Sequence, residues 1–184
     1  MSLLGFCKWL AETPWSIALH ESQYAYLIVE SVHVLTLFVF LGFAIILDLR
    51  LLGLTLRRVP LSNLTVRLLP WTVAGFVIMV LSGAMLFYAI PVRSYQNMFF
   101  RAKMLFLLLA GVNAWLFHSG VYRRIAEWDL DPIPPRRARV AGSVSLILWA
   151  AIVFAGRMIA YNWFDCDQPQ SAFIAVAAGC TDHR

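Results

Sequence analysis

The chain has 184 residues, of which 61% are hydrophobic and only 14% are charged. A soluble domain of this length would need more polar surface, so this composition, with a mean hydropathy of +0.73, indicates a protein of the lipid bilayer. The net charge of +5 does not indicate nucleic-acid binding, because the basic residues lie between apolar blocks and no aromatic-and-basic recognition motif is present.

Residues 2–22 precede the first long apolar block and are predicted to form one or two short helices on the membrane surface. The segment SLLGFCKWLAE is mildly amphipathic, which is typical of a helix lying in the interface. Thr13 followed by Pro14 predicts a helix start, with Thr13 as the N-cap and Pro14 as the first helical residue. We do not expect a signal peptide here, since neither a long apolar region nor a small-residue cleavage site precedes the block.

Four apolar blocks each approach the roughly 20 residues that a helix needs to cross a hydrocarbon core of about 30 Å. They cover about residues 24–47, 71–90, 104–122 and 140–161. The connections are short, and the prolines of EWDLDPIPPRR stop helix continuation, which favours antiparallel neighbours. We therefore predict an all-α integral membrane protein with a single domain. It is an up-down four-helix transmembrane bundle with short interfacial N-terminal helices and a tail over 162–184.

The first block carries Glu30 and His33, its only acidic and imidazole side chains between Ala25 and Leu47. An ionisable group inside a span costs several kcal/mol unless it is paired or faces water. His33 is one turn deeper than Glu30 on the same helix face. It is either hydrogen-bonded to Glu30 or to a neighbouring helix, or it ligates a metal or a haem iron with a carboxylate nearby to tune it.

The third block offers His118 as a second ligand for the same haem. Gly111 lies on the same face seven residues earlier, where it either leaves clearance for a flat cofactor or serves helix packing. His33 is about 14 Å below the outer face, and His118 about 21 Å if its helix begins at Met104. Helix tilt absorbs a difference of about 7 Å, but the difference grows if that helix begins nearer Met98. Met85 and Met158 are the alternative partners for His33, although methionine is also ordinary core filler.

The fourth block carries Arg157 about 4 residues from its outer end, close to 6 Å deep. Glu30 lies about 9 Å deep, so an ion pair between Glu30 and Arg157 is the first expectation. The alternative is that Arg157 holds an anionic group, such as a haem propionate, a quinone oxygen or a lipid phosphate.

The basic residues predict the orientation of the chain. Stretches 48–70 and 119–139 carry nine arginines, against five basic residues on the other side. Positive charge collects on the cytoplasmic side, so we predict a multi-pass protein of the bacterial inner membrane with both termini periplasmic. Cys166 and Cys180 then lie on the oxidising side, where they either form a disulfide or stay as two thiols.

Several strings resemble a family of small, largely uncharacterised bacterial four-helix inner-membrane proteins. They are LDLRLLG (47–53), LLPWTVAGF (68–76), FFRAKMLFLLLAGVNAWLFH (99–118), GRMIAY (156–161) and the ESVH of the first block. The resemblance covers nearly the whole transmembrane portion and implies a four-helix bundle without a defined activity. The architecture is also similar to membrane b-type cytochrome subunits and copper-resistance proteins, and fold similarity alone does not carry function.

Three hypotheses for function follow from these residues. The first is a haem-b-binding electron-transfer protein, with His33, His118, Gly111, Arg157 and Glu30 as cofactor-binding residues. It would pass electrons between quinone or a periplasmic donor and a membrane or periplasmic protein partner. The second is an accessory subunit of a larger membrane complex, and the third is copper or small-solute handling. The sequence contains no nucleotide loop, hydrolase elbow or zinc-type His-Glu motif, so we predict no independent catalytic activity.

Overall fold

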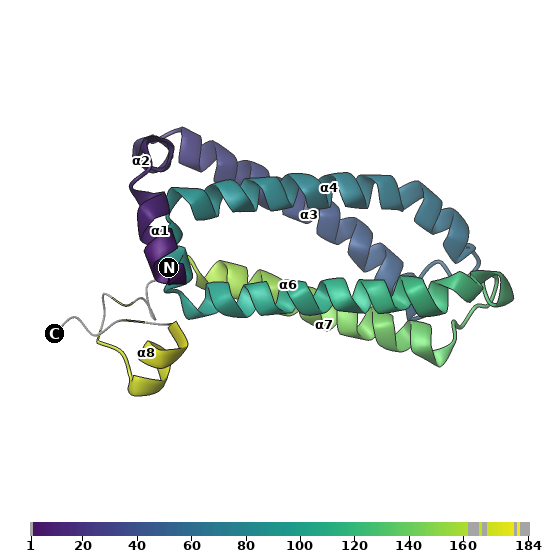
Figure 1. Cartoon of the computed structure of the whole chain (residues 1–184). Coiled ribbons are helices and arrows are strands. Elements are labelled where there is room, and N and C mark those ends of the chain that lie inside the picture. Colours follow the sequence, from purple (N-terminus) through teal and green to yellow (C-terminus); the bar gives the residue numbers. More distant parts are fainter. Residues whose placement is uncertain (1, 162–165, 167–168, 179, 181–184) are drawn as a thin grey trace. The chain divides into compact units, whose positions relative to one another are not determined.

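The computed structural model describes residues 2–161, 166, 169–178 and 180, and all regular structure in that part of the chain is helical. Four helices are long and apolar enough to cross a membrane. They are α3 (Ala25–Leu51), α4 (Leu61–Ala89), α6 (Met98–Leu116) and α7 (Arg136–Met158) (Figure 1). The predicted all-α class with four spanning helices is confirmed.

Shorter helices connect or flank the long ones. α6 continues through a π-helical turn and a 3₁₀ turn, so that its apolar helical stretch extends from Met98 to Glu127. The short elements are α1 (Leu3–Ala11), α2 (Pro14–Glu21), α5 (Pro91–Tyr95), η1 (Phe117–Val121), η2 (Tyr122–Glu127) and α8 (Ala172–Ala178).

The chain divides into two compact units, and every long helix contributes to both. The first unit comprises Met1–His33, Val80–Leu105 and Ile152–Arg184, and the second comprises Val34–Met79 and Phe106–Ala151. Helices α3 and α6 begin in the first unit, whereas α4 and α7 begin in the second. Successive long helices therefore run in opposite directions, as the short connections predict.

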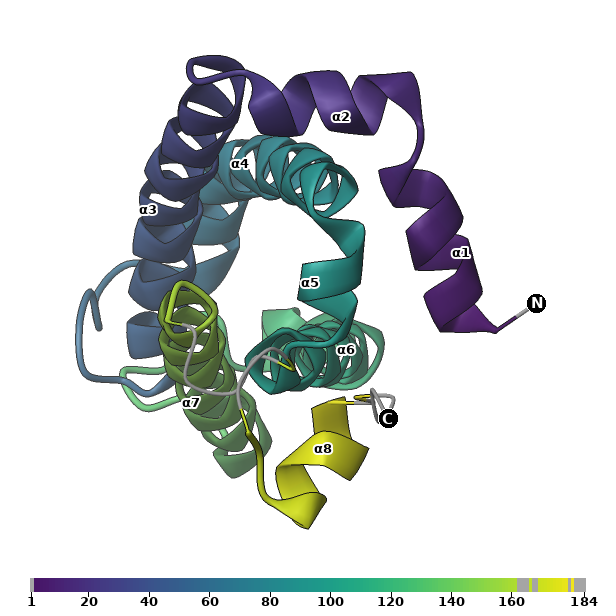
Figure 2. The same ribbon diagram turned by 90° about the vertical axis from the view of Figure 1, so that its left-hand side faces the viewer.

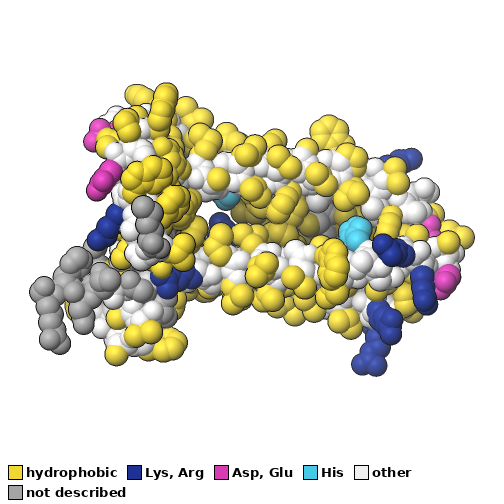
Figure 3. Space-filling view, viewed as in Figure 1, with side chains coloured by type: hydrophobic (Ala, Val, Ile, Leu, Met, Phe, Trp, Pro, Cys, Tyr) yellow, Lys and Arg dark blue, Asp and Glu magenta, His cyan; other side chains and the backbone are white. Residues whose placement is uncertain are grey.

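The outward faces of the long helices are apolar. Figure 3 shows hydrophobic side chains over their visible length, with basic side chains gathered towards the ends. Large exposed hydrophobic residues occur on each of the four, among them Leu35, Phe38, Leu81, Leu108, Ile147 and Phe154. Leaving so much apolar surface in water is unfavourable, so these faces contact the lipid bilayer.

Of the one or two short N-terminal helices predicted, two are present, α1 and α2, and α2 is hydrogen-bonded to the end of α4 (Figure 2). Ser16 on α2 is only 1% exposed. Its hydroxyl donates a hydrogen bond to the Tyr88 carbonyl at 2.7 Å. Thr13 occupies the N-cap position before Pro14, but its side chain makes no capping bond. It donates instead to the Leu10 carbonyl and lies 2.7 Å from the Tyr88 hydroxyl.

Three long helices begin earlier than the predicted apolar blocks, namely α4, α6 and, by four residues, α7. Asn97 starts α6 at Met98, because its side-chain oxygen accepts hydrogen bonds from the Phe99 and Phe100 amides at 3.0 and 3.2 Å. Helix α4 starts at Leu61 and contains Pro70 in its interior, which membrane helices tolerate when neighbouring groups satisfy the freed backbone.

Aromatic packing and glycine contacts form the interior of the second unit. The Phe40 ring on α3 packs edge-on against Trp149 of α7, with ring centroids 4.6 Å apart. Gly75 lets α4 approach α3, since a Cβ at this position would lie 3.3 Å from the Phe40 Cβ. A smaller buried cluster, made of Leu51, Leu61, Trp128 and Ala138, closes the end of this unit.

The C-terminal tail contains a disulfide between Cys166 and Cys180, one of the two alternatives left open by the sequence. Residues 162–165, 167–168, 179 and 181–184 of the predicted outward-facing tail lie outside the described residues. Cys7 on α1 is a free thiol that is 3% exposed, and burial raises its pKa. A raised pKa reduces the thiolate fraction, so we expect this cysteine to be unreactive.

Candidate functional site

His33 is held between α3 and α4 in the first unit. Its Nδ1 lies 3.0 Å from the hydroxyl oxygen of Ser82, a residue that is 5% exposed. A Cβ added at Gly83 would lie 3.1 Å from the His33 Cε1, so the imidazole packs directly against the α4 backbone. Ser82 and Gly83 thus fix the half-buried ring in position and orientation.

This contact has a consequence for the chemistry of His33. When Nδ1 donates its proton to the Ser82 hydroxyl oxygen, Nε2 carries the ring's lone pair. Metal-ligating histidines commonly have their second nitrogen engaged in this way, because the hydrogen bond fixes the tautomer and the orientation of the ring. In that tautomer the His33 ring is held in one orientation by Ser82 and Gly83 of α4.

Glu30 and Arg157 also belong to the first unit, and both side chains are exposed. Among the described residues they do not form the expected ion pair with each other. The Arg157 guanidinium lies over the Tyr161 ring, 5.4 Å from its centroid. Glu30 and Arg93 are both within electrostatic range of Tyr26 on the first turn of α3. The alternative, in which Arg157 meets an anionic group, stays a prediction.

The first unit contains a further basic group that the sequence analysis did not select. Lys103 on α6 is half-buried, and its Nζ lies 3.6 Å from the position that a Cβ at Gly156 of α7 would take. The ammonium therefore lies across a glycine of the neighbouring helix. The sequence does contain a signal for Lys103: it is the sixth residue of a long apolar helix, in the string MFFRAK, where a charged side chain is costly.

His118 lies in the second unit, at the start of the π-helical turn η1. Its Nδ1 is 3.0 Å from the Ala114 carbonyl, which only accepts, so Nδ1 carries the proton of the neutral ring and Nε2 the lone pair. The exposed imidazole packs against Phe117 and Tyr122, with ring centroids 5.4 and 5.3 Å away. Single π-turns in long helices often occur at functional positions.

Gly111 lies seven residues before His118 and faces open space, since a Cβ there would meet no atom within 4 Å. Use of this space by a flat cofactor stays a prediction. The early start of α6 at Met98 lengthens the rise to His118 to about 30 Å at 1.5 Å per residue. His33 and His118 belong to different units, and joining both to one iron remains a prediction.

The second unit contains two buried ionisable residues that sequence analysis missed, near the end of α3. Arg50 is 1% exposed and donates to the carbonyls of Val59, Asp129 and Asp131 at 2.9, 3.3 and 3.3 Å. Asp48 is 6% exposed and accepts a hydrogen bond from Ser145 on α7. Both lie in the string LDLRLLG, beyond the predicted end of the first span.

Taken together, the fold defines a multi-pass α-helical membrane protein with oriented histidines on two of its spans. Among the described residues, no group of three or more His, Cys, Asp or Glu side chains is placed to hold a metal ion. The chain belongs to a family of unknown function, DUF6644, whose model matches residues 17–162. No curated protein and no solved structure matches the chain.

Proposed function

We propose that this protein is a haem-b-binding electron-transfer protein that passes electrons between quinone or a periplasmic donor and a protein partner. The observation that carries the proposal is the shared geometry of His33 and His118. In both, Nδ1 is engaged inside the protein, by the Ser82 hydroxyl in one case and the Ala114 carbonyl in the other. A hydrogen bond at the second ring nitrogen orients metal-ligating histidines in the same way, which supports axial ligation of a haem iron.

The residues of the first unit fit such a group. His33 is half-buried inside a span, where an axial ligand would be shielded from water. Arg157 is exposed near the outer end of α7, and a guanidinium binds carboxylates such as haem propionates well. When bound, the haem would supply one-electron redox chemistry, while His33 and Arg157 would bind and orient it.

The proposed location is the bacterial inner membrane, with both termini periplasmic. Exposed arginines at the second unit's end support this orientation, since positive charge favours the cytoplasmic side. They are Arg57, Arg58, Arg67, Arg123, Arg124, Arg136, Arg137 and Arg139. The disulfide between Cys166 and Cys180 in the first unit supports it too, because disulfides persist on the oxidising side.

The decisive measurement is an absorption spectrum of the protein purified after expression with haem supply. We expect a Soret band and a shift of the visible bands on reduction with dithionite. His33→Ala should abolish haem binding, whereas His20→Ala, a change on the exposed surface of α2, should leave it intact. A wild-type protein without a Soret band would overturn the proposal.

A companion variant identifies the second ligand. His118→Ala should convert a bis-histidine spectrum into that of a five-coordinate or substituted haem if His118 is the partner of His33. If the spectrum is unchanged, Met85→Leu and Met158→Leu test the two candidate methionines, which both lie in the first unit, in the same way.

One observation favours the second function, an accessory subunit of a larger membrane complex. None of the most apolar part of the Met98–Glu127 span is buried within the chain, against 28% for the corresponding part of α7. This span therefore has surface available for contact with a helix of a partner protein. A photo-crosslinking residue at Leu108 of this span should then capture a protein partner in native membranes, and the same residue at Ile147 of α7, similarly exposed, should not. Copper or small-solute handling stays a prediction that no described contact favours.

A further inference from the structure

Asp48 is the most deeply buried acidic side chain among the described residues, and one of its oxygens has no hydrogen-bond partner. The residue is 6% exposed, Ser145 donates a hydrogen bond to its carboxyl group, and its Oδ2 is left without a donor. It stands three residues before the end of α3, about 5 Å along the helix axis from Leu51. A charged carboxylate in such a place costs several kcal/mol unless a cation compensates it.

The nearest basic residue in the sequence does not compensate Asp48. Arg50 follows two positions later, on nearly the opposite side of the helix at about 100° per residue. Its guanidinium donates to the carbonyls of Val59, Asp129 and Asp131 instead. The Arg50 Nη1 has no hydrogen-bond partner, so it does not reach the orphaned oxygen of Asp48 either.

The helix packed against Asp48 brings no charge to it. On α7, Ser145 is the hydrogen-bond donor, and Gly142 is the point of closest approach. A Cβ at Gly142 would lie 3.1 Å from the Asp48 main-chain carbonyl oxygen and 3.1 Å from the Leu51 Cβ. The nearest charged residue on α7 in the direction of its start is Arg139, whose side chain is exposed. The close packing at this point depends on Gly142 and would not require an acidic side chain at position 48.

We propose that Asp48 is a proton-binding site within the membrane, which takes up and releases a proton at its Oδ2. Neutralisation by a proton removes the cost of a buried charge, and the proton occupies the oxygen that the protein leaves unpaired. The Ser145 hydroxyl donates to the other oxygen and holds the carboxyl group in place. A metal cation fits less well, because Na⁺ and similar ions need several oxygen ligands and one orphaned oxygen beside one serine does not supply them.

Proton exchange at this site means that the Asp48 carboxyl group alternates between a protonated and an ionised form. The step is the transfer of one proton from hydronium or water to the Asp48 carboxylate, with no other bond made or broken. Exchange requires that water reaches Oδ2 transiently, from the nearby end of α3. The site is independent of haem binding and does not involve His33 or His118.

Infrared spectroscopy of the protein in lipid nanodiscs tests this claim. At neutral pH we expect the carbonyl-stretching band of a protonated carboxylic acid, its loss in Asp48→Asn, and its retention in Asp131→Asn, which removes an exposed acid from the same unit. The band should shift in D₂O as the proton exchanges. If Asp48→Asn removes only ionised-carboxylate bands, or if the acid band never shifts in D₂O, the proposal is overturned.

A second measurement is made on the wild-type protein, so its main result does not depend on whether a variant folds. Dicyclohexylcarbodiimide reacts with protonated carboxyl groups in apolar surroundings, where the acid adds across the carbodiimide to give an N-acylurea. We expect one adduct, located by mass spectrometry at Asp48, whose yield falls as the pH is raised. Asp48→Asn should reduce labelling to background. Labelling at other acids but not at Asp48 in the wild-type protein would contradict the proposal.

Discussion

The two units differ in how deeply the ionisable residues of their spans are buried and in what those residues contact. In the second unit Arg50 is 1% exposed, and main-chain carbonyls from two loops accept hydrogen bonds from its guanidinium. In the first unit His33 and Lys103 are half-buried and lie against glycines of the neighbouring helices. Arg50 thus stabilises the fold, whereas His33 and Lys103 in the first unit are less deeply buried.

The comparison shows that residue type alone does not reveal a role inside a membrane. An intramembrane charge indicates function by default, since it is expensive to keep there. Arg50 departs from that default because its hydrogen bonds join α3 to the segment before α4 and to the loop after η2. A useful criterion is whether the protein itself supplies the partners of the group.

Replacement of Arg50 by methionine should have the largest effect on stability. The change leaves the carbonyls of Val59, Asp129 and Asp131 without their buried donor. At roughly 1–3 kcal/mol for each unsatisfied buried group, we expect a loss of about 4 kcal/mol in the free energy of unfolding. Thermal unfolding in detergent, followed by circular dichroism, measures it.

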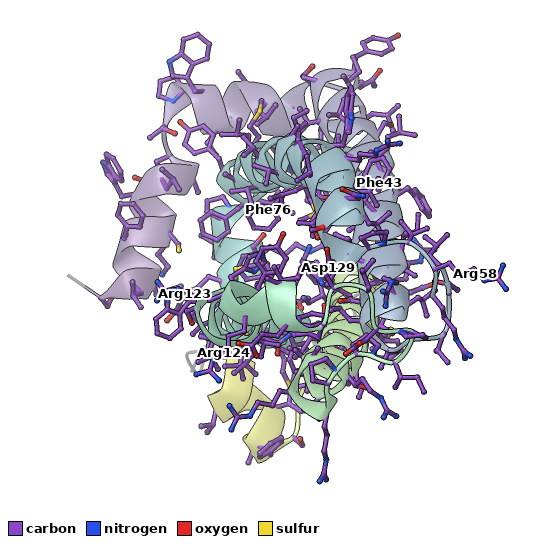
Figure 4. The ribbon with its side chains drawn as sticks, turned by 90° about the vertical axis from the view of Figure 1, so that its right-hand side faces the viewer. Phe43, Arg58, Phe76, Arg123, Arg124 and Asp129 are labelled. Carbon is purple, nitrogen blue, oxygen red and sulfur yellow. A yellow bond between two sulfur atoms is a disulfide. The ribbon has the colours of Figure 1, made fainter. Side chains whose placement is uncertain are left out.

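The matched control is Arg58→Met, which removes a neighbouring arginine whose side chain points away from the helices (Figure 4). An exposed arginine contributes little, so unfolding should change by less than about 0.5 kcal/mol. Equal effects of the two substitutions would contradict the structural role of Arg50.

In the first unit the largest effect should come from breaking the disulfide. The bond joins Cys166 to Cys180, 14 residues apart, and closing a loop of about 15 residues is worth about 3 kcal/mol in the chain-entropy model. We expect Cys166→Ser/Cys180→Ser to speed chymotrypsin cleavage at the exposed Phe173 several-fold. Thermal unfolding of the spans should change little, and unaltered cleavage would show that the bond does not order this segment.

The four spans could be predicted from the sequence because each depends only on a local run of apolar residues. The start of α6 could have been predicted too, since Asn97 before an apolar run is a helix-start signal. The roles of Asp48 and Arg50 could not, because they look like the first residues of a loop and depend on contacts with distant segments. The partnership of His33 with Ser82 likewise depends on the register between α3 and α4.

Glycine substitutions sharpen the comparison of the two units. A Cβ at Gly142 of the second unit would meet a main-chain oxygen and the Leu51 Cβ at 3.1 Å, and neither can move easily. We expect Gly142→Ala to destabilise the protein by about 1–3 kcal/mol, as overpacking does. A Cβ at Gly83 of the first unit would meet the edge of the His33 ring, which can rotate.

Gly83→Ala should therefore cost little stability but displace the imidazole, which a changed haem spectrum would report under the proposed function. Gly42→Ala is the control for both, because a Cβ there meets nothing within 4 Å. It should stabilise α3 by up to about 1 kcal/mol, the usual gain of alanine over glycine in a helix. If all three substitutions have the same effect on unfolding, the two units do not differ in the way described.

A small effect on stability is expected of Ser82→Ala, which removes the hydrogen bond to His33. A neutral hydrogen bond contributes about 1 kcal/mol, so the change in unfolding should be about that size. The informative readout is the imidazole itself. Without Ser82 the ring loses the group that fixes its tautomer, and nitrogen-15 NMR of histidine-labelled protein should show a mixture of Nδ1-H and Nε2-H forms. Ser82→Thr, which keeps the hydroxyl, should restore the wild-type tautomer, and a tautomer unchanged in Ser82→Ala would show that Ser82 does not orient His33.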